Sequence, residues 1–134
     1  MTEQDYTLTI TLNADAAEAE RQVREALQEE GFGVLSEIDV ESALRDKLGE
    51  EIGPYKILGA CNPPLAKRAI DADPDIGALL PCNVLLRANP QGGTDVAAAD
   101  PKAMLAVGAA GLEPVAAEAR ERLERALASL AAAG

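Results

Sequence analysis

Hydrophobic and polar residues alternate strictly near the start of the chain. Residues 6–13 place an apolar side chain at every second position, with threonines between them, and this period of two predicts a strand. From residue 16 to residue 27 the apolar positions recur every three or four residues, which is the period of a helix. We expect Asn13 to cap this helix and Gly31 to end it.

The same two periods continue along the rest of the chain. The second expected strand, residues 32–40, would hold Phe32, Val34, Ser36, Ile38 and Val40 on one side. Strands are also expected over 54–61, 82–88 and, more weakly, 94–100, with a turn at 89–93. The mostly apolar run 82–88 favours a central strand or one that is buried on both faces. Helices are expected around 43–48, from Asn62-Pro63 to the sequence DADPD, in part after Pro101, and over 114–132.

The predicted order β-α-β-α-β-α-β-β-α is that of a single α+β domain over residues 1–134, with helices on one face of a sheet. The last helix carries Glu118 four residues before Arg122 and Glu121 four residues before Arg125. Ion pairs at this spacing stabilise a helix.

The amino-acid composition argues against two classes of binding partner for this protein. The chain has 134 residues and a net charge of −11, and its basic residues are scattered among acids. Binding to nucleic acid or to an anionic membrane depends on clustered basic residues, so neither is expected. The N-terminal residues lack the pattern of a signal peptide, and the longest apolar runs are too short to span a bilayer. We therefore expect a cytoplasmic protein whose cysteines are reduced thiols.

The residues offer little for catalysis. The chain has no histidine, which excludes Ser-His-Asp and Cys-His pairs, and it has neither a phosphate-binding nor a dinucleotide-binding glycine motif. Asp71, Asp73 and Asp75 form an acidic run, but Pro74 interrupts it and no coordinating glutamate follows in register. We interpret this run as a turn at a helix end, and a binding or interaction module is favoured over an enzyme.

The two cysteines of the chain are each followed by an asparagine, as Cys61-Asn62 and Cys82-Asn83. Cys61 ends the third expected strand and Cys82 begins the fourth. If these strands are antiparallel neighbours, both thiols lie at the same end of the sheet; if they are parallel, the thiols lie at opposite ends. A connection of this length that contains a helix favours the parallel arrangement.

A family resemblance favours the opposite arrangement. The family numbered 302 among the domains of unknown function is similar to this chain from Tyr6 to about Leu130, above all in PYKILGACNPPLAKRAIDADPDIGALLPCNVLL and EGFGVLSEIDV. The resemblance implies a TATA-box-binding-protein-like α+β fold of the β-α-β4-α type, with a five-stranded, mostly antiparallel sheet, helices on one face and a long C-terminal helix. It also implies a homodimer, and it brings Cys61 close to Cys82. No activity is established for the family, so the resemblance predicts a fold and not a function.

The cysteines have a structural interpretation that needs no ligand. Free cysteine is often buried and packs as a small hydrophobic side chain. Asn62 is explained as a helix cap. Asn83 is disfavoured inside a strand, and if it is buried its amide needs a partner, for which the other Cys-Asn loop is a candidate.

Three functional interpretations remain open beside it. Two close thiols could bind a soft metal ion such as copper(I), whereas zinc would need further ligands from a carboxylate or a second subunit. The start of the helix after Cys61 would favour a thiolate, as a redox pair or thiol sensor requires. A small ligand could also bind in the groove between the sheet and the C-terminal helix.

Overall fold

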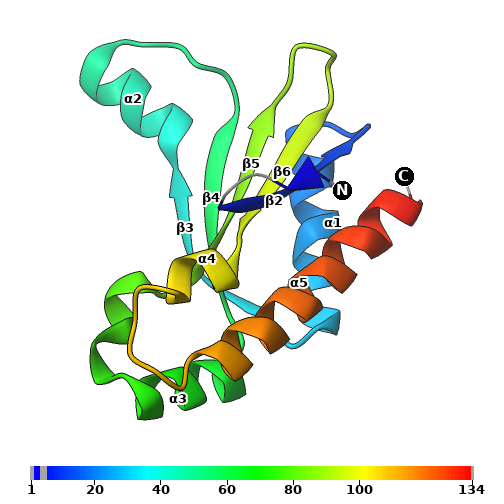
Figure 1. The fold of residues 1–134 in the computed structure, drawn as a ribbon. Helices are drawn as coiled ribbons and strands as arrows, with labels where there is room; N and C mark the ends of the chain where they lie inside the picture. Colours follow the sequence, from blue (N-terminus) through cyan, green and yellow to red (C-terminus); the bar gives the residue numbers. More distant parts are fainter. Residues whose placement is uncertain (1, 4–5, 134) are drawn as a thin grey trace.

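The computed structural model describes residues 2–3 and 6–133, and it shows an antiparallel sheet flanked by helices (Figure 1). The strands lie in the order β1-β2-β6-β5-β4-β3, and every neighbouring pair is antiparallel. The α+β class and the five expected strands are confirmed, and the two-residue β1 extends the sheet beside β2. The strands are β1 (Thr2–Glu3), β2 (Thr7–Leu12), β3 (Gly33–Asp39), β4 (Tyr55–Cys61), β5 (Cys82–Ala88) and β6 (Thr94–Ala99).

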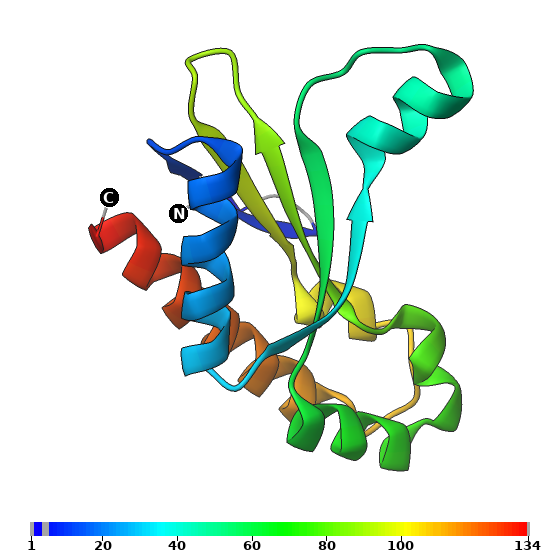
Figure 2. The same cartoon turned by 180° about the vertical axis from the view of Figure 1, so that it is seen from behind.

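Two long helices, α1 (Ala16–Glu29) and α5 (Glu113–Ala133), pack against each other and against one face of the sheet. The helix α2 (Val40–Leu48) lies at one end of the sheet, and α3 (Pro63–Ala72) lies at the other (Figures 1 and 2). The short 3-10 helix η1 (Pro74–Leu79) and α4 (Pro101–Leu105) pack together near α3. None of the helices in the described part of the chain is long and apolar enough to cross a bilayer.

Two local details of the helices differ from expectation. The cap of α1 is Asp15 and not Asn13, because the Asp15 carboxylate accepts a hydrogen bond of 2.9 Å from the backbone N–H of Glu18. On α5 the pair of Glu118 with Arg122 is confirmed at 3.2 Å. Arg125, in contrast, contacts Glu30 at the end of α1, at 3.1 Å, and so links the two long helices.

A β-bulge in β3 changes the face on which its side chains lie. Val34 pairs with Ala60 and Ser36 with Gly59, so Leu35 is the extra residue between them. Val34 packs against the core, whereas Ser36 lies on the other side of the sheet. The expectation that one side of β3 carries every second residue from Phe32 to Val40 is therefore wrong, since alternation restarts after the bulge.

The core is divided into two hydrophobic clusters. The first lies between the sheet and helices α1 and α5, and the second joins α3, η1, α4 and the first half of α5. In β5, Val84 and Leu86 are buried in the first cluster, while Asn83 and Arg87 are exposed. β5 is interior in the sheet, as predicted, but helices cover only one of its faces.

The opposite side of the sheet, which we call the outer face, contributes no residue to either cluster among the described residues. Its central row consists of Thr9, Ala97, Leu85, Ile57 and Ile38, and it runs straight across the paired strands because each member is the register partner of the next. Alternation along the strands assigns to the outer face Thr7, Thr9, Thr11, Gly33, Ser36, Ile38, Tyr55, Ile57, Gly59, Cys61, Asn83, Leu85, Arg87, Asp95, Ala97 and Ala99.

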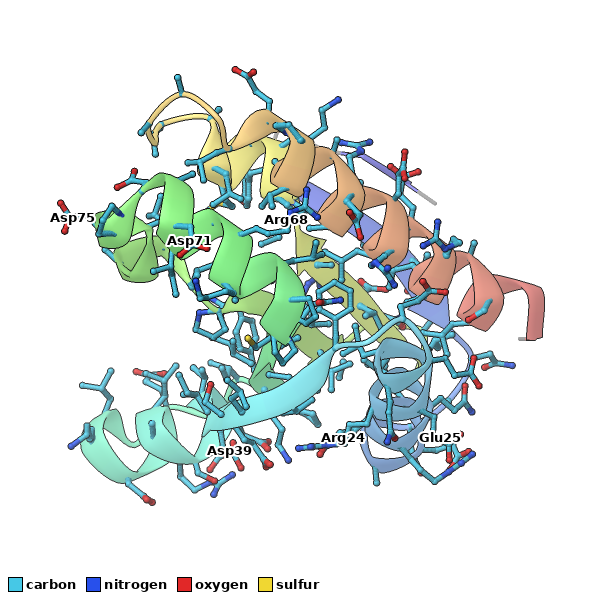
Figure 3. All side chains as sticks on the ribbon, turned by 90° about the horizontal axis from the view of Figure 1, so that it is seen from below. Arg24, Glu25, Asp39, Arg68, Asp71 and Asp75 are labelled. Carbon is cyan, nitrogen blue, oxygen red and sulfur yellow. The ribbon has the colours of Figure 1, made fainter. Side chains whose placement is uncertain are left out.

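A ring of four charged side chains attaches the edge strand β3 to α1. The Lys56 ammonium lies 2.8 Å from carboxylate oxygens of both Glu20 and Glu37. Arg24 contacts the same two carboxylates, at 2.9 and 2.8 Å, and lies between α1 and β3 in Figure 3. The hydrogen bonds that Lys56 donates to Glu20 and Glu37 raise the pKa of its ammonium group. Because β3 buries no side chain fully, this ring supplies much of its attachment to α1.

Two strand glycines provide a test of the packing on the outer face. A Cβ on Gly59 would lie 2.2 Å from Ser36 Oγ and 2.7 Å from Pro81 Cγ, whereas a Cβ on Gly33 would meet nothing within 4 Å. We expect Gly59→Ala to lower the free energy of unfolding by about 1–3 kcal/mol through overpacking. Gly33→Ala, the matched control, should change it by less than about 0.5 kcal/mol. Urea unfolding measures both, and equal effects would show that Gly59 is not constrained by its neighbours.

Candidate functional site

The pairing of β4 with β5 brings both cysteines to one end of the sheet. The two strands are antiparallel, and Cys82 lies directly opposite Ala60, the residue before Cys61. The connection between the strands contains α3 and η1, which pack beside the end of the sheet and return to it on the same side. The connection does not cross the sheet, so the parallel arrangement is not formed, and the arrangement that the family resemblance implied is confirmed.

Both thiols are free, and neither is activated. Burial, and to a smaller extent the neighbouring Cys61, raises the pKa of the Cys82 thiol to about 11. Burial also raises the pKa of Cys61. Burial thus opposes the thiolate that the start of α3 beside Cys61 would favour, and it holds the pKa of both thiols above the ordinary value.

Asn62 connects three parts of the chain and is almost fully buried. Its side-chain oxygen accepts a hydrogen bond of 3.3 Å from the backbone N–H of Leu65, which caps α3 as predicted. Its amide nitrogen donates to the backbone carbonyl of Glu30, also at 3.3 Å. Asn62 thus holds the start of α3 against the turn between α1 and β3.

Asn83 has a different environment. It is exposed on the outer face, opposite Gly59, so solvent can satisfy its amide. The condition under which Asn83 would need a protein partner, its burial, is not met, so a bond to the other Cys-Asn loop is not required. The two Cys-Asn dipeptides therefore lie close together but have different structural roles.

A cavity of about 300 Å³ lies where the two hydrophobic clusters meet, and we call it the α3 cavity. Figure 3 views this end of the molecule, with α3, α5 and β3 around it. The cavity is bounded mainly by α3, both cysteines, α4 and the first half of α5. It therefore differs in position from the groove between the sheet and the C-terminal helix, in which the sequence-based hypothesis placed a small ligand. Its lining is Phe32, Leu35, Ala60, Cys61, Asn62, Leu65, Ala66, Ala69, Ile70, Gly77, Leu80, Pro81, Cys82, Pro101, Leu105, Val115 and Ala119.

Part of this lining was visible in the sequence. The apolar residues of α3 recur at helical spacing as Leu65, Ala66, Ala69 and Ile70, and all four line the cavity. Leu35 was not predicted, because it reaches the cavity from the bulge in β3, and the alternation of apolar residues gives no sign of that bulge.

The acidic run after α3 belongs to a turn, as predicted. Asp73 accepts hydrogen bonds of 3.1 Å from the backbone N–H groups of Asp75 and Ala109, and Asp71 contacts Lys67. Within the described residues, no group of three or more histidine, cysteine or acidic side chains is arranged to hold a metal ion.

Comparisons with known proteins agree with this fold. The model of the domain of unknown function DUF302 matches residues 8–130. The chain belongs to the DUF302 family. It is also similar to the crystal structure of an uncharacterised conserved DUF302 protein from Bacillus stearothermophilus, with a TM-score of 0.83 and 28% identity over 90% of this chain and 94% of that one. No curated protein matches the chain.

The twin asparagines of this DUF302 domain allow a matched substitution. Asn62→Ala removes the cap of α3 and the bond to Glu30, and we expect a loss of about 1–2 kcal/mol in the free energy of unfolding. Asn83→Ala should change stability by less than about 0.5 kcal/mol, since the side chain is exposed. Urea unfolding of the two variants measures the difference. Equal losses would contradict the separate roles assigned to the two residues.

Proposed function

We propose that the protein binds a small apolar ligand in the α3 cavity. The observation that carries the proposal is an apolar cavity left open at the junction of two hydrophobic clusters. Protein interiors contain few voids larger than a water molecule, whereas small-molecule sites occupy about 300–1,000 Å³ and are lined mostly by apolar side chains. The cavity falls at the lower end of that range, which fits a small ligand.

Two other functions for the cysteines are less well supported. Coordination of a soft metal ion such as copper(I) and thiol redox chemistry both proceed through thiolates. Burial disfavours the thiolate form of Cys61 and of Cys82. As neutral thiols the two side chains contribute polarisable, weakly polar surface to an apolar site.

The ligand proposal is tested with 1-decanol as the probe. Below its solubility limit it should raise the melting temperature of the wild-type protein by a few degrees, because it binds only the folded state. It should also slow the alkylation of Cys61, which lines the cavity and is only partly buried.

The matched variants are Ala66→Leu, which fills the cavity from α3, and Ala128→Leu, on the exposed face of α5. Ala66→Leu should abolish the response to 1-decanol, and Ala128→Leu should retain it. If both variants respond like the wild type, the ligand binds elsewhere. Should the wild type show neither a thermal shift nor protection of Cys61, the cavity is not a site for such ligands.

We also propose that the protein is a homodimer that associates through the outer face. A chain with a net charge of −11 repels a second copy wherever acidic surfaces meet. The outer face is neutral, because its two charged residues, Arg87 and Asp95, form an ion pair at 3.2 Å. Its central row is mostly apolar, and in it Ile38 is 53% exposed. A face that carries no net charge and has a mostly apolar central row suits a symmetric contact with itself.

Leu85→Lys tests this surface, because Leu85 lies in the middle of the central row. We expect sedimentation to show a dimer for the wild type and a monomer for Leu85→Lys, since two buried ammonium groups would face each other across the symmetric contact. Val107→Lys is the control, because Val107 is 78% exposed and lies outside this face; it should remain dimeric. A monomeric wild type, or a dimeric Leu85→Lys, would contradict the proposal.

A further inference from the structure

The lining of the α3 cavity carries no charged side chain. Its one amide, Asn62, is already hydrogen-bonded within the protein, to the N–H of Leu65 and to the carbonyl of Glu30. The remaining polar side-chain groups are the two thiols, which burial keeps protonated. A ligand inside the cavity therefore meets no charge and no open amide, so a polar group buried there would lose its hydrogen bonds to water without replacement.

The size and lining of the cavity also restrict the shape of the ligand. Phe32 is the one aromatic residue of the lining, and the other apolar residues are aliphatic. With about 300 Å³ to fill, the cavity is at the small end of known ligand sites. Both features favour a single aliphatic chain over a set of fused rings.

Two cations of α3 beside the lining are paired with acids of the protein, whereas for Lys102, which follows the lining residue Pro101, no ion pair is found among the described residues. Lys67 and Asp71 directly follow the lining residues Ala66 and Ile70 on α3, and their charges are 2.6 Å apart. Arg68 contacts Glu118 of α5 at 2.8 Å, and Figure 3 shows Arg68 on α3 beside α5. An anionic headgroup would have to compete with these carboxylates, in the field of a chain that carries a net charge of −11.

We infer that the α3 cavity accepts uncharged aliphatic molecules, such as medium-chain alcohols, and rejects anionic amphiphiles such as fatty acids of the same length. This inference rests on the proposed ligand site and specifies its ligand class. Selection arises because the lining offers nothing to a charge and the chain as a whole is strongly negative.

The experiment compares 1-decanol with decanoate, which have the same chain length and differ in the charge of the head. Both are titrated at neutral pH, below the concentration at which decanoate forms micelles, with the thermal shift and the protection of Cys61 as readouts. We expect decanoate to bind at least about tenfold more weakly than 1-decanol. High salt should narrow this gap, because it screens the repulsion of the anion and leaves the alcohol unaffected.

A matched pair of variants locates the source of the selectivity. Asp71→Asn leaves Lys67 without its carboxylate, and the gap between decanoate and 1-decanol should shrink. Asp46→Asn removes the same charge from the exposed surface of α2, at the other end of the sheet, and should leave the gap unchanged. Equal affinities of 1-decanol and decanoate for the wild type would overturn the inference while leaving the ligand site intact. Absence of binding by both probes would overturn the proposed site, and the inference with it.

Discussion

The antiparallel pairing of β4 with β5 is the constraint on which the rest of this structure depends. Because Cys82 starts β5 opposite the last residues of β4, the chain between them must leave and re-enter the sheet at one end. The segment that does so, α3 followed by η1, cannot lie over the face of the sheet that α1 and α5 already cover. It packs instead against α4 and the first half of α5, and forms a second hydrophobic cluster there. The division of the core into two clusters is a consequence of this one strand pairing.

The α3 cavity lies at the boundary between these clusters. Phe32 and Ala60 belong to the cluster under the sheet, while Leu65 and Leu105 belong to the cluster around α3, and all four line the cavity. Where the two clusters meet, helices and strands that run in different directions direct their side chains into the same region. Small residues there, such as Ala66 and Gly77, leave part of that region empty. Asn62 keeps this arrangement fixed, since it holds the start of α3 to the turn after α1.

Much of the fold follows from patterns that are local in the sequence. The alternation of β2, the Asn62-Pro63 opening of α3 and the helix expected over 114–132 each depend on neighbouring residues, and each is predicted correctly. What depends on distant contacts is not predicted in this way. The bulge at Leu35 exists only relative to β4, and the exposure of Asn83 depends on which face of β5 the helices cover. For the site, the apolar spacing of α3 was accessible from the sequence and the position of the cysteines from the family resemblance, whereas the cavity itself is formed by seven elements that no local pattern connects.

The distribution of charge links the two surfaces to which functions are proposed. A net charge of −11 leaves most of the exposed surface acidic, with cations such as Lys56, Lys67 and Arg24 held in contact with carboxylates. Two surfaces are exceptions. The lining of the α3 cavity has no charged residue, and on the outer face the charges of Arg87 and Asp95 neutralise each other in an ion pair. Desolvating an unpaired carboxylate is costly, so contacts that exclude water form most readily where the chain carries no net charge. The acidic remainder acts against such contacts elsewhere, which is why the proposed dimer contact and the proposed ligand site are assigned to these two surfaces.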